Sequence, residues 1–70
     1  MIANRTSVSL GRRIKRARLD KCVTQDELGQ VLGVKQTTIS NYECGRRRPD
    51  NETIMIISRY LDTPILKQNG

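Results

Sequence analysis

Four uncharged polar side chains recur along one short stretch of this chain, and each of them carries an amide or a hydroxyl group. The stretch reads GVKQTTISNYECGRRRP, residues 33 to 49. The four side chains are Gln36, Thr37, Ser40 and Asn41. At 100° per residue on a helix they fall within an arc of about 140°, with Ile39 and Tyr42 on the far side. Because amides and hydroxyls both donate and accept hydrogen bonds, this polar arc predicts a surface that recognises a ligand by its hydrogen-bond donors and acceptors.

Positive charge is concentrated near this surface. Arg46, Arg47 and Arg48 follow it directly, and residues 11 to 21 hold six basic side chains against one acidic side chain. The 70 residues carry 13 Lys and Arg against 7 Asp and Glu, a net charge of +6. Such an excess favours a polyanionic partner, with nucleic acid as the first candidate. We expect phosphate contacts from the three arginines and from one or two of the basic side chains between residues 12 and 16.

Helices are needed to position the polar arc, and a first helix is predicted from about residue 9. Ser9 is a suitable N-cap, and Leu10, Ile14 and Ala17 recur at spacings of four and three. Such spacing is typical of the buried face of a helix.

The next two helices are predicted to be joined by a tight turn. Thr24 and Glu27 form a capping-box pattern that starts one helix, and Gly33 can end it in the left-handed conformation. The polar stretch then forms a third helix over residues 36 to 43, with Gly45 past its end. Two short helices joined by a glycine turn make a helix-turn-helix unit, and the DNA major groove admits one α-helix. The polar arc could therefore address base edges.

A fourth helix is predicted after Pro49, with Asp50 or Asn51 as its N-cap. Its core positions are Ile54, Ile57 and Leu61. One more helical turn is predicted to begin at Pro64 and to hold Ile65 and Leu66. The fold class is thus expected to be all-α, a compact bundle of four to five short helices.

The predicted organisation is a flexible arm over residues 1–8, a helix-turn-helix domain over 9–64 and a short tail over 65–70. Several apolar side chains near the C-terminus exceed what one small core can cover, so some are expected to form a dimer contact. These are Met55, Ile56, Tyr60, Ile65 and Leu66.

Between Leu10 and Leu61 the chain resembles the phage repressor and Cro-type helix-turn-helix proteins, also called the xenobiotic-response-element family. The resemblance rests on TQDELG from residue 24, GVKQTTISNYECG from residue 33 and RRP from residue 47, in the family's order and spacing. It implies a lambda-repressor-like DNA-binding domain in a sequence-specific transcriptional regulator, expected to be a repressor.

The resemblance also implies roles for individual residues. The resemblance implies base contacts in the major groove by Gln36, Thr37, Ser40 and Asn41, and we expect Lys35 to join them for the reason given below. Phosphate contacts are expected of Thr24, Gln25, Thr38, Tyr42, Arg46, Arg47 and Arg48. Arg18 and Glu43 match a pair that in relatives forms a partly buried salt bridge between the first and third helices.

Three residues depart from the family pattern. Gly29 replaces the usual alanine, which keeps the helices close but costs the second helix roughly 0.8–1 kcal/mol. Lys35 stands where a small capping residue is common, and a lysine at a helix N-terminus opposes the helix dipole. We therefore expect Lys35 to contact a phosphate or a guanine edge. Cys44 stands where asparagine is common, so a phosphate contact there would come from the main chain.

Other interpretations of the same residues are open. The first nineteen residues lack acids, as a mitochondrial presequence does, but they also supply apolar side chains that the domain needs. Cys22 and Cys44 could form a disulfide, and Cys44 beside arginines could act as a redox sensor, but we expect two ordinary exposed thiols. Single-stranded RNA binding would have only Tyr42 and Tyr60 for base stacking.

The composition disfavours catalysis and metal binding. The chain has no histidine and two cysteines, so neither a zinc cluster nor a disulfide scaffold is expected. It shows no glycine-rich phosphate loop, no nucleophile with an evident base, and no apolar run long enough to span a membrane. We expect no enzyme activity, no cofactor and no metal, and a cytoplasmic protein of bacterial or phage origin that lies on the nucleoid.

The expected partner is double-stranded DNA. A homodimer would place its two reading helices about 34 Å apart on an inverted repeat. The main alternative is a protein-interaction module, such as an antitoxin or a coactivator-like adaptor, in which DNA contact is secondary.

Overall fold

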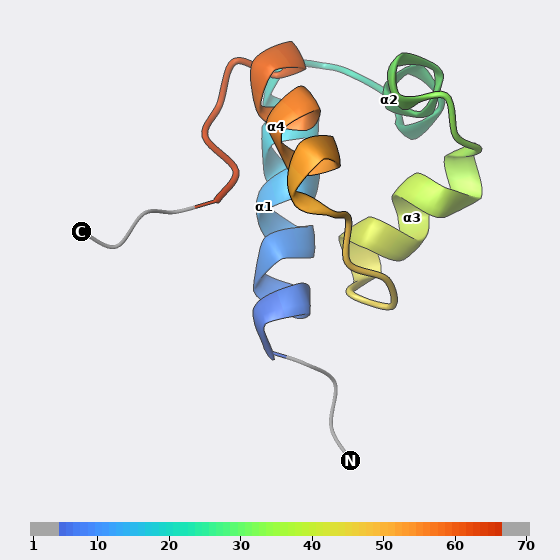
Figure 1. Ribbon diagram of the computed structural model, residues 1–70. Helices are drawn as coiled ribbons and strands as arrows, with labels where there is room; N and C mark the ends of the chain where they lie inside the picture. The colour runs from blue at the N-terminus through green and yellow to red at the C-terminus, as the bar shows by residue number, and fades with distance from the viewer. Residues whose placement is uncertain (1–4, 67–70) are drawn as a thin grey trace.

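The computed structural model describes residues 5–66, with side chains from residue 9 onward. Four α-helices follow one another, namely α1 (Arg5–Asp20), α2 (Gln25–Leu32), α3 (Gln36–Cys44) and α4 (Asn51–Tyr60) (Figure 1). Residues 5–66 contain no β-strand. The predicted all-α class is confirmed, with four helices. None of the helices in this part of the chain combines the length and the apolar character that crossing a bilayer requires.

Local sequence sets the ends of α2 and α3. The Thr24 hydroxyl accepts a hydrogen bond from the Glu27 N–H at 3.0 Å, and the Glu27 carboxylate accepts one from the Thr24 N–H at 2.8 Å. Gly33 ends α2 at φ 72° and Gly45 ends α3 at φ 81°. Glycine adopts this left-handed conformation without the steric cost that a Cβ brings. The predicted capping box and both glycine stops are confirmed.

The first helix is longer than predicted. It begins at Arg5, so Ser9 lies inside α1 rather than at its N-cap, and residues 5–8 are helical rather than part of a loose arm. No Pro occurs before α1 ends and no Gly precedes Gly11, and serine in a helix costs less than about 0.7 kcal/mol relative to alanine. Residues 1–4 of the expected arm lie outside the described part of the chain.

The core draws side chains from all four helices and from the segment after α4. Its members are Leu10, Ile14, Ala17, Leu28, Ile39, Tyr42, Ile54, Ile57, Leu61 and Ile65. α3 packs against both α1 and α2. At Gly11 the backbones of α1 and α3 approach so closely that a Cβ would lie 2.5 Å from the carbonyl oxygens of Tyr42 and Glu43. The position of α3 on α1 therefore depends on the absence of a side chain at Gly11.

The chain after α4 is irregular, and the predicted fifth helical turn is wrong. Residues 61–66 form turns and bends, and the Ile65 N–H donates to Ser58 Oγ at 3.2 Å. The residue before a proline is disfavoured in the helical conformation, and the irregular path of the chain after Pro64 lets Ile65 bury its side chain completely. Ile65 is therefore unavailable for the predicted dimer contact. The other four side chains of that set are exposed, namely Met55, Ile56, Tyr60 and Leu66.

Candidate functional site

A buried ion pair joins α1 to α3. Arg18 Nε donates to Glu43 Oε2 at 2.6 Å and Arg18 Nη2 donates to Glu43 Oε1 at 3.1 Å, so the contact is bidentate. A third donor of the same guanidinium, Nη1, bonds the Val23 carbonyl oxygen at 2.8 Å. The two side chains are 8% and 3% exposed. This is the pair that the family resemblance implies, and it holds the Glu43 carboxylate next to Gln25, the first residue of α2.

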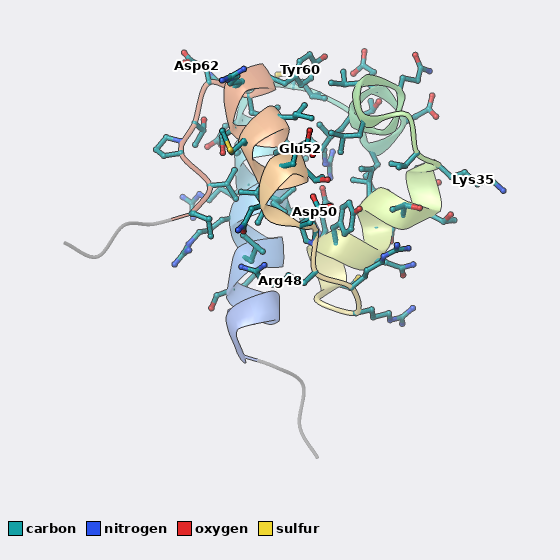
Figure 2. The ribbon with its side chains drawn as sticks, in the orientation of Figure 1. Lys35, Arg48, Asp50, Glu52, Tyr60 and Asp62 are labelled. Atoms are coloured by element: carbon teal, nitrogen blue, oxygen red, sulfur yellow. The ribbon has the colours of Figure 1, made fainter. Side chains whose placement is uncertain are left out.

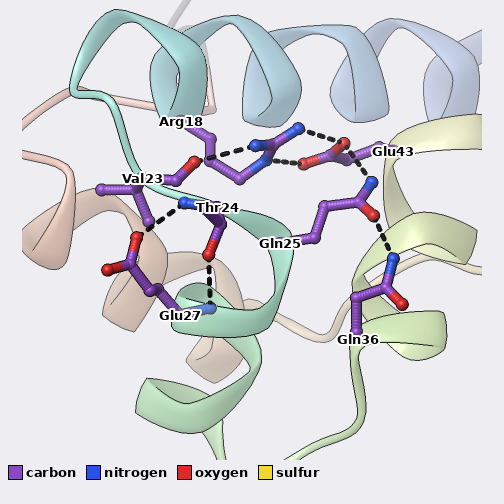
Figure 3. A network of polar contacts seen from close by, with 7 residues as sticks. All are labelled: Arg18, Val23, Thr24, Gln25, Glu27, Gln36 and Glu43. Carbon is purple, nitrogen blue, oxygen red and sulfur yellow. Dashed lines mark hydrogen bonds and ion pairs between the residues drawn. The ribbon is translucent and has the colours of Figure 1, made fainter.

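The ion pair begins a chain of hydrogen bonds that ends on the surface of α3 (Figure 3). Gln25 Nε2 donates to Glu43 Oε1 at 2.9 Å. Gln25 Oε1 in turn accepts a hydrogen bond from Gln36 Nε2. The carboxylate can only accept, so it fixes which end of the Gln25 amide faces it, and that orientation fixes the Gln36 amide in turn. Figure 3 shows the Gln36 oxygen pointing away from the network.

The polar arc lies on the outside of the domain. Gln36 and Thr37 are exposed in the first turn of α3, and Ser40 and Asn41 are half-buried one turn later. Ile39, on the opposite side of the same helix, is completely buried. The helix therefore turns its apolar side to the core and leaves the four polar side chains accessible to a ligand.

Lys35 extends from the turn that precedes α3. It occupies the N-cap position with φ −77° and ψ 158° and makes no side-chain capping hydrogen bond. Figure 2 shows its side chain directed away from the domain. The first turn of α3 thus lacks a side-chain acceptor, and a cation stands at the positive end of the helix dipole. An anionic ligand at this point would offset that unfavourable charge.

Three exposed arginines lie at the other end of α3. The N–H groups of Arg46 and Arg47 both donate to the Asn41 carbonyl oxygen, at 3.0 and 3.3 Å, which fixes the turn to the last turn of the helix. Arg48 follows and is also exposed. The polar arc is therefore flanked by cationic side chains at both of its ends, which is the arrangement that a polyanion with readable edges requires.

The other predicted phosphate contacts differ in how accessible they are. Tyr42 is 7% exposed and belongs to the core, which leaves its hydroxyl little surface with which to reach a phosphate. Thr24 is exposed and Thr38 is half-buried. Cys22 and Cys44 are exposed free thiols, and no disulfide joins them. Within residues 9–66, no group of three His, Cys, Asp or Glu side chains is placed to hold a metal ion.

Two features of the site were missed in the sequence. Gly11 has a signal that could have revealed it, because it precedes Arg18 by seven residues, or two helical turns, and so lies on the same side of α1. The hydrogen bond between Gln25 and Gln36 has no such signal, because it depends on the angle that the Gly33 turn sets between α2 and α3.

A family model for helix-turn-helix proteins matches residues 14–68. The chain belongs to the helix-turn-helix family. One relative of this helix-turn-helix chain is multiprotein-bridging factor 1 of Candida albicans, 32% identical over 93% of the chain and 43% of its own length. Another is the HTH-type transcriptional regulator ImmR of Bacillus subtilis, 39% identical over 73% of the chain and 40% of its own length. The chain thus spans less than half the length of either relative.

Solved structures share the helix-turn-helix fold described above. The clp gene regulator ClgR of Corynebacterium glutamicum superposes with a TM-score of 0.82 at 25% identity, covering 91% of this chain and 68% of that one. The restriction-modification controller protein C.AhdI of Aeromonas hydrophila superposes with a TM-score of 0.79 at 22% identity, covering 89% of this chain and 94% of that one. The arrangement of the helices is therefore common to this chain and to two proteins named as a regulator and a controller.

Proposed function

We propose that this helix-turn-helix chain is a sequence-specific, double-stranded DNA-binding regulator of transcription, acting as a repressor, that inserts α3 into the major groove. The observation that carries the proposal is the placement of Gln36. It is exposed at the start of α3 and is held by Gln25 against the buried pair of Arg18 and Glu43. A fixed amide offers a donor and an acceptor together, which matches adenine in the major groove. Because the side chain is ordered before binding, contact costs little further entropy.

The remaining base contacts follow from the same face of α3. Thr37 offers a methyl group to thymine and a hydroxyl to either partner of a base pair, and Asn41 offers a second amide. Ser40 lies between them on the helix and can donate or accept. Lys35 at the N-cap extends far enough from the domain to reach a guanine edge or a phosphate.

Phosphate contacts would hold the domain in register. Gln25 is the first residue of α2, so a phosphate there would meet both its second amide hydrogen and the positive end of the helix dipole. The other groups proposed for phosphates are Thr24, Thr38, Arg46, Arg47 and Arg48. Neutralising about 4–8 phosphates in a complex predicts that log affinity falls with log salt concentration at a slope of about −4 to −7.

A homodimer on an inverted repeat completes the proposal. Two copies would place their α3 helices about 34 Å apart, one helical turn of DNA. Apolar side chains that the fold leaves exposed on and after α4 are the proposed contact between copies. These are Met55, Ile56, Tyr60 and Leu66. Binding to chromosomal DNA would place the protein in the cytoplasm, at the nucleoid of a bacterium or of a phage-infected cell.

The test is a selection of bound fragments from random DNA duplexes, followed by substitution. Selection should return one motif with inverted symmetry. On that motif, Gln36→Ala should cost about 1–3 kcal/mol and relax one base position. Gln30→Ala is the matched control, because Gln30 is an exposed glutamine of α2 whose side chain bonds only Asp26, at 3.1 Å, among the described residues. A selection that returns no motif would contradict sequence-specific reading.

A second candidate function is a protein-interaction module, such as an antitoxin or a coactivator-like adaptor, in which DNA contact is secondary. One observation favours it: a relative named as a multiprotein-bridging factor matches 93% of the chain. This candidate predicts weak, sequence-blind binding to duplex DNA and no change of specificity in Gln36→Ala or Thr37→Ala. The same selection and the same two variants therefore separate the two functions.

A further inference from the structure

One flank of α1 carries a cationic groove. The groove is lined by Arg12, Lys15, Arg16, Leu19 and Asp20. All five side chains are exposed. Three basic groups and one acidic group leave the groove with an excess of two positive charges, and none of them forms an ion pair with another described residue.

The groove runs along the flank of α1, beside the side that contacts α3. Gly11 and Arg18 mark the side of α1 that contacts α3, since they meet the backbone and the side chain of Glu43. At roughly 100° per residue, Lys15 is turned by about 50° from that side, Arg12 and Leu19 by about 100° and Arg16 by about 150°. Leu19 also lines the neighbouring hollow with Gln25 and Gln36, so a ligand on Leu19 would lie beside the start of α3.

The groove combines charge with apolar surface. Leu19 is 55% exposed and supplies the apolar part of the lining. The aliphatic stems of Arg12 and Arg16 extend the apolar surface around it, while their guanidinium groups stay in water. An apolar centre with a cationic rim fits a partner that carries an apolar side chain beside carboxylates.

We propose that this groove binds an acidic segment of another protein, with an apolar side chain packed on Leu19 and carboxylates paired with Arg12 and Arg16. Carboxylates match the planar fork of a guanidinium, so the two arginines can each take a bidentate partner. A DNA backbone satisfies the charge but has no apolar group to cover Leu19. The groove thus distinguishes a protein partner from a second duplex, and the inference does not depend on the DNA-binding proposal.

The test uses two probes and three variants of the full chain. The first probe is a synthetic peptide with leucine at every third or fourth position and Glu or Asp between, and the second is polyglutamate of equal charge. The variants are Arg12→Gln/Arg16→Gln, Leu19→Ala and the charge-matched control Arg46→Gln/Arg47→Gln. Binding is followed by fluorescence anisotropy, and circular dichroism checks that each variant is folded, which exposed positions should allow.

The peptide should bind the parent more tightly than polyglutamate does. Arg12→Gln/Arg16→Gln should weaken peptide binding roughly five- to thirty-fold, and Leu19→Ala about three- to ten-fold. Arg46→Gln/Arg47→Gln should leave peptide binding unchanged while it weakens duplex DNA binding.

Three results would overturn the inference. The first is equal affinity for peptide and polyglutamate, or no binding of either by the parent. The second is an equal loss of peptide binding in both arginine pairs, which would indicate unspecific attraction to net charge. The third is a loss of duplex binding in Arg12→Gln/Arg16→Gln as large as that in Arg46→Gln/Arg47→Gln, which would make the groove a DNA surface. If the parent binds the peptide but no DNA, the proposed function is contradicted and this inference is still supported.

Discussion

Arg18 on α1 and Glu43 on α3 lie 2.6 Å apart between Nε and Oε2, although 25 residues separate them along the chain. The same carboxylate holds Gln25, and Gln25 holds Gln36. One buried contact therefore stabilises the packing of two helices and also orients a side chain on the exposed face of α3. Stability and recognition are linked through Glu43 and are expected to respond together when it is changed.

Removing one partner of this pair should cost more than removing both. Arg18→Met leaves the Glu43 carboxylate buried without its counter-ion, and the expected loss is about 3–5 kcal/mol of unfolding free energy. In Arg18→Met/Glu43→Leu no charge is left buried, so the double variant should be more stable than Arg18→Met alone. Urea denaturation of the two single variants and the double variant measures this. Losses that simply add would show that the pair is not coupled.

Gln25→Ala should alter DNA recognition through Gln36. Without Gln25 the Gln36 amide loses its fixed partner, so its base position should be read less strictly even though Gln36 is still present. A double-mutant cycle of Gln25→Ala and Gln36→Ala, measured on the selected duplex, should give a coupling energy of about 0.5–3 kcal/mol. Gln30→Ala serves as the control, with no coupling expected. A coupling energy of zero would show that Gln25 does not position Gln36.

Lys35→Ser should change stability and DNA affinity in opposite directions. Serine supplies the side-chain acceptor that the first turn of α3 lacks and removes a cation from the positive end of the helix, so stability should rise by about 0.5–2 kcal/mol. The contact to a guanine edge or a phosphate is lost, so duplex affinity should fall. Thermal unfolding and duplex titration test the two effects separately. Unchanged affinity in Lys35→Ser would mean that Lys35 does not contact DNA.

The parts of the fold that depend on neighbouring residues were predictable from the sequence. The Thr24 and Glu27 capping box and the glycine stops at Gly33 and Gly45 are set by interactions within a few residues, and all of them are present. The buried apolar positions of α1 and α4 follow from helical spacing alone. By contrast, no single residue determines that α1 begins at Arg5, because several weak helix preferences contribute to this start.

The parts that depend on tertiary contacts were not predictable. Ile65 was assigned to a helical turn on local grounds, but it is buried in the core from a segment that is not helical. Tyr42 was expected to contact a phosphate, but it is only 7% exposed, and its position relative to α1 depends on the close approach at Gly11. The link from Gln25 to Gln36 likewise arises from the angle between two helices, which the order of residues does not reveal.

Gly11→Ala should destabilise the domain although alanine favours helix. The intrinsic preference for alanine is about 1 kcal/mol, but its Cβ would lie 2.5 Å from two backbone carbonyl oxygens of α3, and backbone cannot move aside cheaply. We expect a net loss of about 1–3 kcal/mol by urea denaturation. Gly33→Ala is the comparison, because a Cβ added there would meet nothing within 4 Å and only the positive φ is unfavourable, at roughly 1 kcal/mol. A stabilised Gly11→Ala would show that α1 and α3 can separate without cost.

The cap of α4 should make stability depend on acid pH. Asp50 accepts a hydrogen bond from the Thr53 N–H at 2.8 Å, and the Thr53 hydroxyl together with this N–H holds the pKa of Asp50 below its usual 3.8. Because the folded pKa is the lower one, the stabilisation is complete well above pH 3.8 and is lost as the pH falls through the folded value.

Asp50→Asn isolates this contribution, since asparagine also caps a helix but does not titrate. The difference in unfolding free energy between the parent and Asp50→Asn should be constant above about pH 5 and should shift toward the variant as the pH is lowered to about 2. Urea denaturation of both proteins across this range measures the difference directly. The other acidic groups are the same in both proteins, so their contributions to the difference cancel. A difference that stays the same at every pH would show that the carboxylate of Asp50 gains nothing from Thr53 in the folded state.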